Sequence, residues 1–229
     1  MKMRYKENIN IWFSSRLFFL SIFIFLLACQ STIIQDTGDL IKVPNASAVP
    51  VLIDGLFSEN EWNDAREIQM SDNYTLYLKK KQGHVFLGIK IIPFYSQIIE
   101  LYISPDKERI YHFHASAQIG EILIKSDSDW ENQQFRWGNS NGWYANEIRW
   151  DQYKRDSLQN VKVADNEAFM QSMYKFEGFE FQILKSKFKT NKWRIMLEIP
   201  GPPDYENPFT YPTGSEKRNT DTWMELILD

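Results

Sequence analysis

The chain has 229 residues, a formal net charge of −4 at pH 7 and a single cysteine, Cys29. The acidic balance argues against a nucleic-acid partner, because contacts to phosphate need a basic surface. With one cysteine the chain cannot form an internal disulfide or a metal site of several thiolates.

Residues 1–28 have the pattern of a secretory signal peptide. A basic head precedes the apolar run Leu17–Ala28, which is too short for a membrane-spanning helix of about 20 residues. The ending Leu-Leu-Ala-Cys29 resembles the lipobox of bacterial lipoproteins, in which cleavage precedes a cysteine that carries lipid. We therefore expect a lipid anchor at Cys29 and a place in the cell envelope, outside the cytoplasm. The alternative is an uncleaved N-terminal anchor.

The mature chain is expected to form one domain behind a tether. Residues 1–28 carry more basic than acidic groups, so their removal brings the formal charge to about −7. We interpret residues 29–48 as the tether, with one edge strand over Leu40–Val43. Residues 49–229 are long enough for one large β-sandwich, and no internal repeat or low-complexity block is visible.

The segment VLIDGLFSENEWNDA, residues 51–65, predicts a strand, a turn and one helical turn. The letters VLI favour the strand, and Asp54-Gly55 favours the turn, because glycine accepts positive φ and aspartate bonds to its own backbone. Ser58 and Glu61 have the spacing of a capping box. Trp62 is then expected to fold back and close one end of a sheet.

This opening resembles that of the family 9 carbohydrate-binding modules, which are β-sandwiches related in fold to the DOMON haem- and sugar-binding domains. The resemblance rests on Ile-Asp-Gly, the acidic capped turn, Trp62 and the small residue Ala65. The segment Lys192–Pro200 is similar to a late strand of these modules, although Glu-Ile-Pro is compressed here. The tryptophans that sandwich sugar in that family have no position-by-position counterpart. The resemblance implies an all-β sandwich that binds sugar, and no room remains for a catalytic domain.

Alternating apolar residues predict strands through most of the remaining chain. Tyr74, Leu76 and Leu78 alternate with Thr75, Tyr77 and Lys79, and a turn at Gly83 follows. Such spacing favours an antiparallel all-β sandwich with one or two short helices. The further expected elements are strands over Val85–Ile92, Ile98–Ser104, Arg109–Ala117, Phe179–Leu184, Trp193–Pro200 and Trp223–Leu228, a helical turn over Lys185–Phe188, a helix or long loop over Val161–Met173, and a long surface loop over Gly201–Asp221.

The region Glu121–Tyr153 combines many aromatic residues with amides and arginines. Aromatic faces stack on the C–H surfaces of sugars while polar groups bind the hydroxyls, so this region supplies both kinds of contact. The candidate stacking residues are Trp130, Trp137, Trp143 and Trp150. The alternative is that these rings pack in the core or in cross-strand pairs.

The same region contains Gly138-Asn-Ser-Asn-Gly142, a formal match to the G-x-S-x-G motif of serine hydrolases. That motif needs a helix after the serine. Trp143–Trp150 predicts a strand instead, so we interpret the glycine-flanked segment as a hairpin loop. The carboxylates Glu121, Asp129, Glu147 and Asp151 are scattered, and they give no acid–base pair without known distances.

His112 and His114 are two residues apart on an expected strand, so they point to the same side. They could line a pocket on a groove face or simply face solvent. Our hypothesis is a lipid-anchored, non-catalytic protein that binds carbohydrate without a cofactor. One alternative is a DOMON-like haem or metal carrier with His112, His114 or Met170 as ligand. The other is an envelope lipoprotein that binds a protein partner.

Overall fold

The computed structural model of the chain describes the domain and leaves out several segments. The chain divides into two compact units, Met1–Asp36 and Thr37–Asp229, and every described residue belongs to the second. Predictions at Cys29, at Trp130 and Trp150, and at Val161–Met173 lie outside the described residues. The described residues are 40–47, 51–58, 60–92, 98–125, 133–138, 141–147, 176–201 and 206–229.

The larger sheet contains both the first and the last described strand of the domain. It consists of β1 (Leu40–Lys42), β5 (Ile99–Ser104), β6 (Arg109–Ala115), β7 (Ile119–Lys125), β8 (Arg136–Trp137), β11 (Lys192–Ile199), β12 (Phe209–Tyr211) and β13 (Met224–Ile227). The spatial order of this eight-stranded sheet is β1-β13-β11-β5-β6-β7-β8, and β12 pairs with β11 beside that path. Only β1 and β13 pair in parallel among these described strands.

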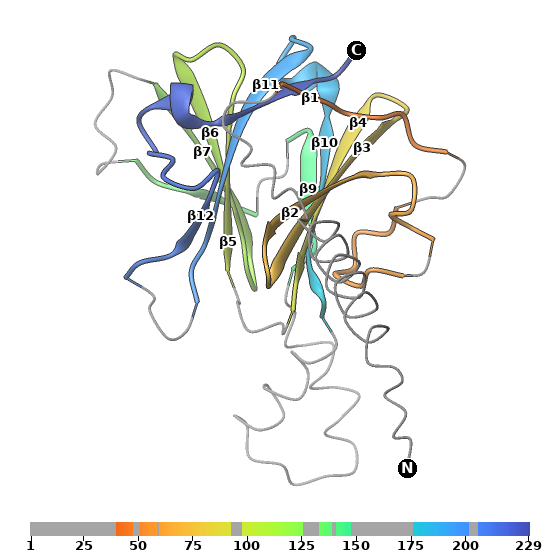
Figure 1. Cartoon of the computed structure of the whole chain (residues 1–229). Coiled ribbons are helices and arrows are strands. Elements are labelled where there is room, and N and C mark those ends of the chain that lie inside the picture. Colours follow the sequence, from red (N-terminus) through yellow and green to blue (C-terminus); the bar gives the residue numbers. More distant parts are fainter. Residues whose placement is uncertain are drawn as a thin grey trace, which may run out of the picture. The chain divides into compact units, whose positions relative to one another are not determined.

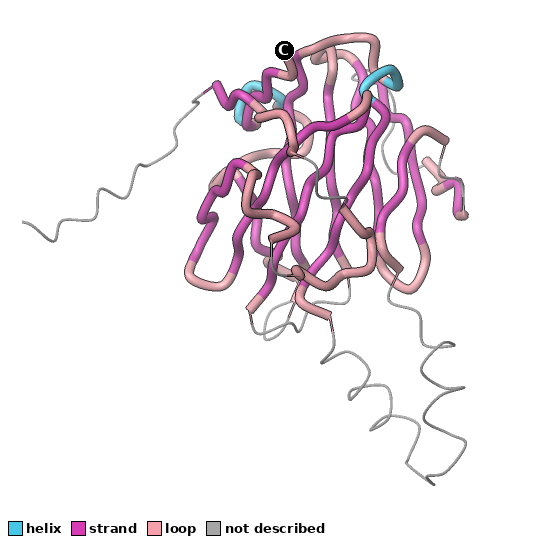
Figure 2. Tube along the Cα trace, turned by 90° about the vertical axis from the view of Figure 1, so that its right-hand side faces the viewer, coloured by secondary structure: helices cyan, strands magenta, loops and turns pink. Residues whose placement is uncertain are grey.

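The smaller sheet covers one face of the larger. It consists of β2 (Arg66–Ser71), β3 (Tyr74–Lys81), β4 (His84–Ile91), β9 (Trp143–Ala145) and β10 (Gly178–Leu184). These five strands lie in the order β2-β3-β4-β10-β9, and all pairings are antiparallel. Figure 1 shows the two sheets as separate layers, with β5, β6 and β7 in one and β2, β3 and β4 in the other. Figure 2, turned by 90°, shows that strands make up most of the described domain. The predicted all-β architecture is confirmed.

The space between the sheets is filled by apolar side chains from both inner faces. Tyr74, Leu76 and Leu78 are buried as their alternation predicts, and Phe113 and Trp193 come from the opposite sheet. Aliphatic and aromatic burial of this kind, roughly 1.5–3 kcal/mol per large side chain, is the main stabilising contribution in a domain without disulfides. Because the main core lies between the sheets, a binding site has to be sought on their outer faces.

Most of the predicted strands and the turn at Gly83 are present. Gln82 and Gly83 have φ of 48° and 78°, the backbone of a two-residue hairpin turn, between β3 and β4. The helical turn near Lys185 is confirmed as the 3₁₀ turn η2 (Lys185–Lys187), and a second one, η3 (Thr220–Thr222), precedes β13. The predicted edge strand at Leu40 is β1, so the sandwich includes part of the segment interpreted as a tether.

Three predictions about local structure are wrong. Residues 51–53 form no strand, and the expected loop at Gly201–Asp221 contains β12 and η3. The glycine-flanked segment around Ser140 is no hairpin, because β8 before it pairs with β7 in the large sheet and β9 after it pairs with β10 in the small one. No helix follows within residues 141–147, so the structural context of a serine nucleophile elbow is missing there.

Candidate binding face on the eight-stranded sheet

The outer face of the eight-stranded sheet brings three of the predicted site residues together. Cross-strand register places Glu100 of β5 opposite His114 of β6, His114 opposite Gly120 of β7, and Gly120 opposite Trp137 of β8. Directly paired residues share a face of the sheet, so these four positions form one row. His112 lies in the next row, opposite Tyr102. The prediction that His112 and His114 point to the same side is confirmed.

The carboxylate of Glu100 lies between the two imidazoles. His112 Nε2 is 2.7 Å from Glu100 Oε2, and His114 Nδ1 is 2.8 Å from Glu100 Oε1. The second nitrogen of His114 is 2.8 Å from Ser116 Oγ. Burial raises the pKa of Glu100, but the hydrogen bonds from His112 and His114 outweigh it, and the net pKa is lowered. Glu100 is therefore an ionised acceptor with a fixed orientation.

Two aromatic rings lie against these histidines. The ring centroids of His114 and Trp137 are 5.2 Å apart and nearly perpendicular, and Phe135 lies 4.9 Å from both Trp137 and His112. Gly120 makes this packing possible, since a Cβ there would lie 2.8 Å from Trp137 Cε3. Trp137 remains 53% exposed, so one face of its ring is open to solvent. We call Glu100, His112, His114, Phe135 and Trp137 the outer platform.

A small second hydrophobic cluster supports the outer platform from the same face. It consists of Tyr102, Ile110, Ile122, Ile124, Met196 and Trp223, with Phe135 packed against it. The Tyr102 ring stacks on His112 at 4.1 Å, and burial, with the nearby Glu198 and Glu100, raises the pKa of its hydroxyl. Lys217 Nζ lies 2.9 Å from Glu198 Oε2. The histidines are thus flanked on the outer face by packed apolar side chains and by the Lys217–Glu198 ion pair.

The prediction for Trp143 is wrong. This side chain is only 3% exposed and lies in the main core, within 4.7 Å of the Phe113 ring. Its indole Nε1 donates to Glu121 Oε2 at 2.9 Å, and Lys187 Nζ lies 3.0 Å from Glu121 Oε1. Trp143 therefore satisfies a buried carboxylate and offers no face to a ligand. Glu121 is likewise occupied as a structural ion-pair partner.

The geometry of the histidines bears on the haem or metal alternative. Three of their four ring nitrogens already contact Glu100 or Ser116, and both nitrogens of His114 are among them, so a metal bound by both imidazoles would have to displace at least one hydrogen bond of His114. Within the described residues, no group of three or more His, Cys, Asp or Glu side chains has an arrangement that could hold a metal ion. Met170, the other ligand in that alternative, lies outside these residues.

Sequence reasoning missed Glu100 and Gly120, the acceptor and the floor of the outer platform. A signal for Glu100 was present, because the short turn after Ser104 fixes the β5–β6 register and places it opposite His114. Gly120 had no such signal, since its pairing with Trp137 depends on a connection that includes residues 126–132. In the described part of the chain, no helix is long and apolar enough to span a membrane.

Comparison with known proteins supplies no identity for this fold. No protein-family model, curated protein or solved structure matches the chain. The two-sheet architecture is seen in the structure, and the resemblance to family 9 carbohydrate-binding modules stays a prediction that rests on residues 51–65 and Lys192–Pro200.

Proposed function

We propose that this chain is a lipid-anchored, extracytoplasmic protein that binds carbohydrate on the outer platform and catalyses no reaction. The observation that carries the proposal is the exposed Trp137 ring, which lies against His114, and the hydrogen bond that ties His114 to the Glu100 carboxylate. An aromatic face beside oriented acceptors is the combination that a sugar ring requires, with its C–H surface on the ring and its hydroxyls toward the polar groups.

The polar groups of the platform can take up hydroxyls without losing their present partners. Each Glu100 oxygen accepts one imidazole hydrogen bond and keeps a further lone pair. Ser116 adds a hydroxyl at the end of the same row, where it contacts His114. Because these side chains are held by one another and by the hydrophobic cluster beside them on the same face, binding costs little ordering of the protein.

The electrostatics favour binding over hydrolysis. Glycoside hydrolysis uses two carboxyl groups, one of which is kept protonated as the general acid through a raised pKa. Glu100 has a lowered pKa, and its neighbour across the sheet, Glu198, is paired with Lys217. Glu100 therefore lacks the raised pKa of a general acid, and Glu198 is engaged in an ion pair.

The proposal is tested by a glycan-array and affinity-gel screen of the full chain, followed by substitution of the platform. Trp137→Ala should weaken binding at least roughly tenfold, because a large aromatic contact contributes more than 1.4 kcal/mol. Tyr144→Ala is the matched control, since Tyr144 is 41% exposed but lies on the other sheet. Absence of any glycan ligand, or full affinity in Trp137→Ala, would remove the assignment and favour a protein-binding lipoprotein.

The anchor is tested separately. Labelled fatty acid should enter the wild-type chain during growth and should be absent from Cys29→Ser, which should also leave the membrane fraction. Labelling of the Cys29→Ser chain would contradict the anchor without touching the binding site.

A further inference from the structure

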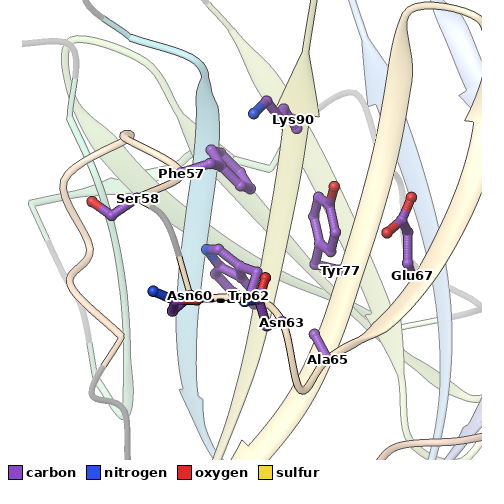
Figure 3. A pocket seen from close by; sticks show the side chains of 9 residues that line it. All are labelled: Phe57, Ser58, Asn60, Trp62, Asn63, Ala65, Glu67, Tyr77 and Lys90. Carbon is purple, nitrogen blue, oxygen red and sulfur yellow. Dashed lines mark hydrogen bonds between the residues drawn. The ribbon is translucent and has the colours of Figure 1, made fainter.

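A cavity of about 310 Å³ opens on the outer face of the five-stranded sheet, away from the outer platform. Three aromatic rings form its wall, as Figure 3 shows: Phe57 and Trp62 from the segment before β2, and Tyr77 from β3. Their centroids are 5.8 to 5.9 Å apart in each pair. We call this the Trp62 pocket. Its volume is at the lower end of the range for small-molecule sites, which suits a single ring.

The position of Trp62 is fixed from below. Gly88 of β4 lies beneath it, and a Cβ at that position would come within 2.8 Å of Trp62 Cζ2 and 2.9 Å of Phe57 Cε1. The indole Nε1 donates to Glu180 Oε1 at 3.0 Å, and the other oxygen of Glu180 accepts from the backbone of Gly55 at 2.8 Å. The prediction that Trp62 closes an end of a sheet is therefore wrong: the ring packs against Gly88 on the outer face of the five-stranded sheet, where Glu180 holds its indole nitrogen.

The rim of the Trp62 pocket is polar and carries both donors and acceptors. Asn63 Nδ2 donates to Asn60 Oδ1 at 2.7 Å, and this bond does not use the amide NH₂ of Asn60 or the side-chain carbonyl of Asn63. Glu67 and Lys90 also line the cavity. Lys90 is paired with Glu177 at 2.9 Å, so its charge is balanced within the protein. Burial, with the nearby Glu67, raises the pKa of Tyr77, which keeps its hydroxyl protonated as a donor.

The charged groups around the aromatic wall favour an uncharged ligand. Lys90 Nζ lies 5.6 Å from the Phe57 ring centroid, and Lys79 Nζ lies 5.1 Å from that of Trp62. Two of the three rings thus already have an ammonium group of the protein as a cation–π partner, and those ammonium groups are paired with Glu177 and Asp64, so a cationic ligand would have to compete for the same rings. An anion would meet Glu67 at the rim. An uncharged ligand with an apolar face and many hydroxyls meets neither obstacle.

We infer that the Trp62 pocket is a second carbohydrate site, which takes one pyranose unit against Phe57 and Tyr77 with its hydroxyls toward Asn60, Asn63 and Glu67. This inference shares its ligand class with the proposed function but uses none of the same residues. The two sites lie on the outer faces of different sheets, with the core between them. One domain would then hold two glycan chains at once, or two segments of one long chain, and gain affinity for polysaccharide through its two sites.

The test is a calorimetric titration of the full chain with short oligosaccharides of glucose, xylose, mannose and N-acetylglucosamine. Three variants are compared with the wild type: Trp137→Ala for the outer platform, Phe57→Ala for the Trp62 pocket, and Tyr144→Ala as a control on the pocket's own sheet. Phe57 belongs to a loop and only partly covers Trp62, so its removal is a milder change than removal of Trp62 itself. Far-ultraviolet circular dichroism confirms that each variant is folded.

Each outcome of the titration decides the inference. Two equivalents of sugar for the wild type and Tyr144→Ala, but one equivalent for each of the other two variants, is the expected result. One equivalent that disappears in Trp137→Ala and persists in Phe57→Ala overturns the second site and leaves the proposed function intact. One equivalent that disappears only in Phe57→Ala supports the Trp62 pocket and overturns the outer platform. No binding of any sugar overturns both.

Discussion

Substitution of Gly120 by alanine tests the outer platform without removing any of its side chains. The new Cβ would lie 2.8 Å from Trp137 Cε3 and 3.1 Å from Phe135 Cδ1, short of the 3.4 Å at which ordinary contact begins. The Trp137 ring therefore has to retreat by roughly half an ångström, which is enough to lose a quarter or more of each close contact. Its edge contact with His114 is the one most directly affected.

The stability of Gly120→Ala should change little. The glycine lies in a strand with ordinary φ, so alanine gains about 0.4–1 kcal/mol by restricting the unfolded chain. The displaced ring is 53% exposed and can move into solvent, which limits the cost of the overlap. These effects oppose each other, and we expect the free energy of unfolding to stay within about 1 kcal/mol of wild type.

Sugar affinity should nevertheless fall by about tenfold or more, because the Trp137 ring no longer holds its position against His114 and Phe135. Titration with the oligosaccharide selected in the screen gives the affinity, and urea denaturation gives the stability. Lys125→Ala, at the exposed end of the same strand, is the control. A folded Gly120→Ala protein that binds sugar as the wild type does would refute the reasoning, since the platform could not then depend on the position of Trp137.

Two further predictions concern the interior. Burial raises the pKa of Glu180 to about 8, so the stability from its protonated form is fully present below the unfolded pKa of 4.5 and is lost as pH rises through 8. At 1.36 kcal/mol per unit, urea denaturation should show a loss of up to about 5 kcal/mol across that window, and Glu180→Gln should flatten it; a flat wild-type profile would contradict this. Trp143→Phe leaves buried Glu121 without its indole donor and should cost about 1–3 kcal/mol in the same assay, with sugar affinity unchanged. Weakened sugar binding in a stable Trp143→Phe protein would return Trp143 to the binding residues.

Much of the structure could be predicted because short turns fix the register of strands that are neighbours in the sequence. A two-residue turn at Gln82-Gly83 fixes the β3–β4 register, and that register alone places Tyr77 opposite Gly88. An aromatic residue opposite a glycine on an outward position is the arrangement on which the Trp62 pocket is built. The hairpin of β5 and β6 likewise aligns Glu100 with His114. Where strand partners are neighbours along the chain, the alternation of residues is enough to assign both faces.

The predictions that failed concern residues whose partners are far away in the sequence. Glycines around Ser140 suit a tight hairpin, but the strands before and after it join different sheets, and nothing nearby in the sequence encodes that change. The burial of Trp143 depends on a carboxylate 22 positions earlier in the chain. Such choices are made by tertiary packing, which overrides local preference.

The missing strand at residues 51–53 has a specific cause. Its backbone donors are taken by side chains instead of by a neighbouring strand: Leu52 N–H bonds to Glu61, and Asp54 N–H bonds to Glu180. Glu61 was expected only to cap a helical turn. An apolar triplet predicts a strand only when a strand partner is within reach, and here carboxylates satisfy the backbone in its place.

The parallel pairing of β1 with β13 has a consequence for how the domain is made. Leu40 lies opposite Glu225, so the first described strand finds its partner only when nearly the whole chain is present. The β5–β6–β7 meander can form early from local contacts, whereas closing the sheet edge joins residues far apart in sequence, which is slow. During vectorial synthesis β1 would stay unpaired until β13, the last strand, has been made. A chain that stops before Met224 should therefore lose order at both of its ends.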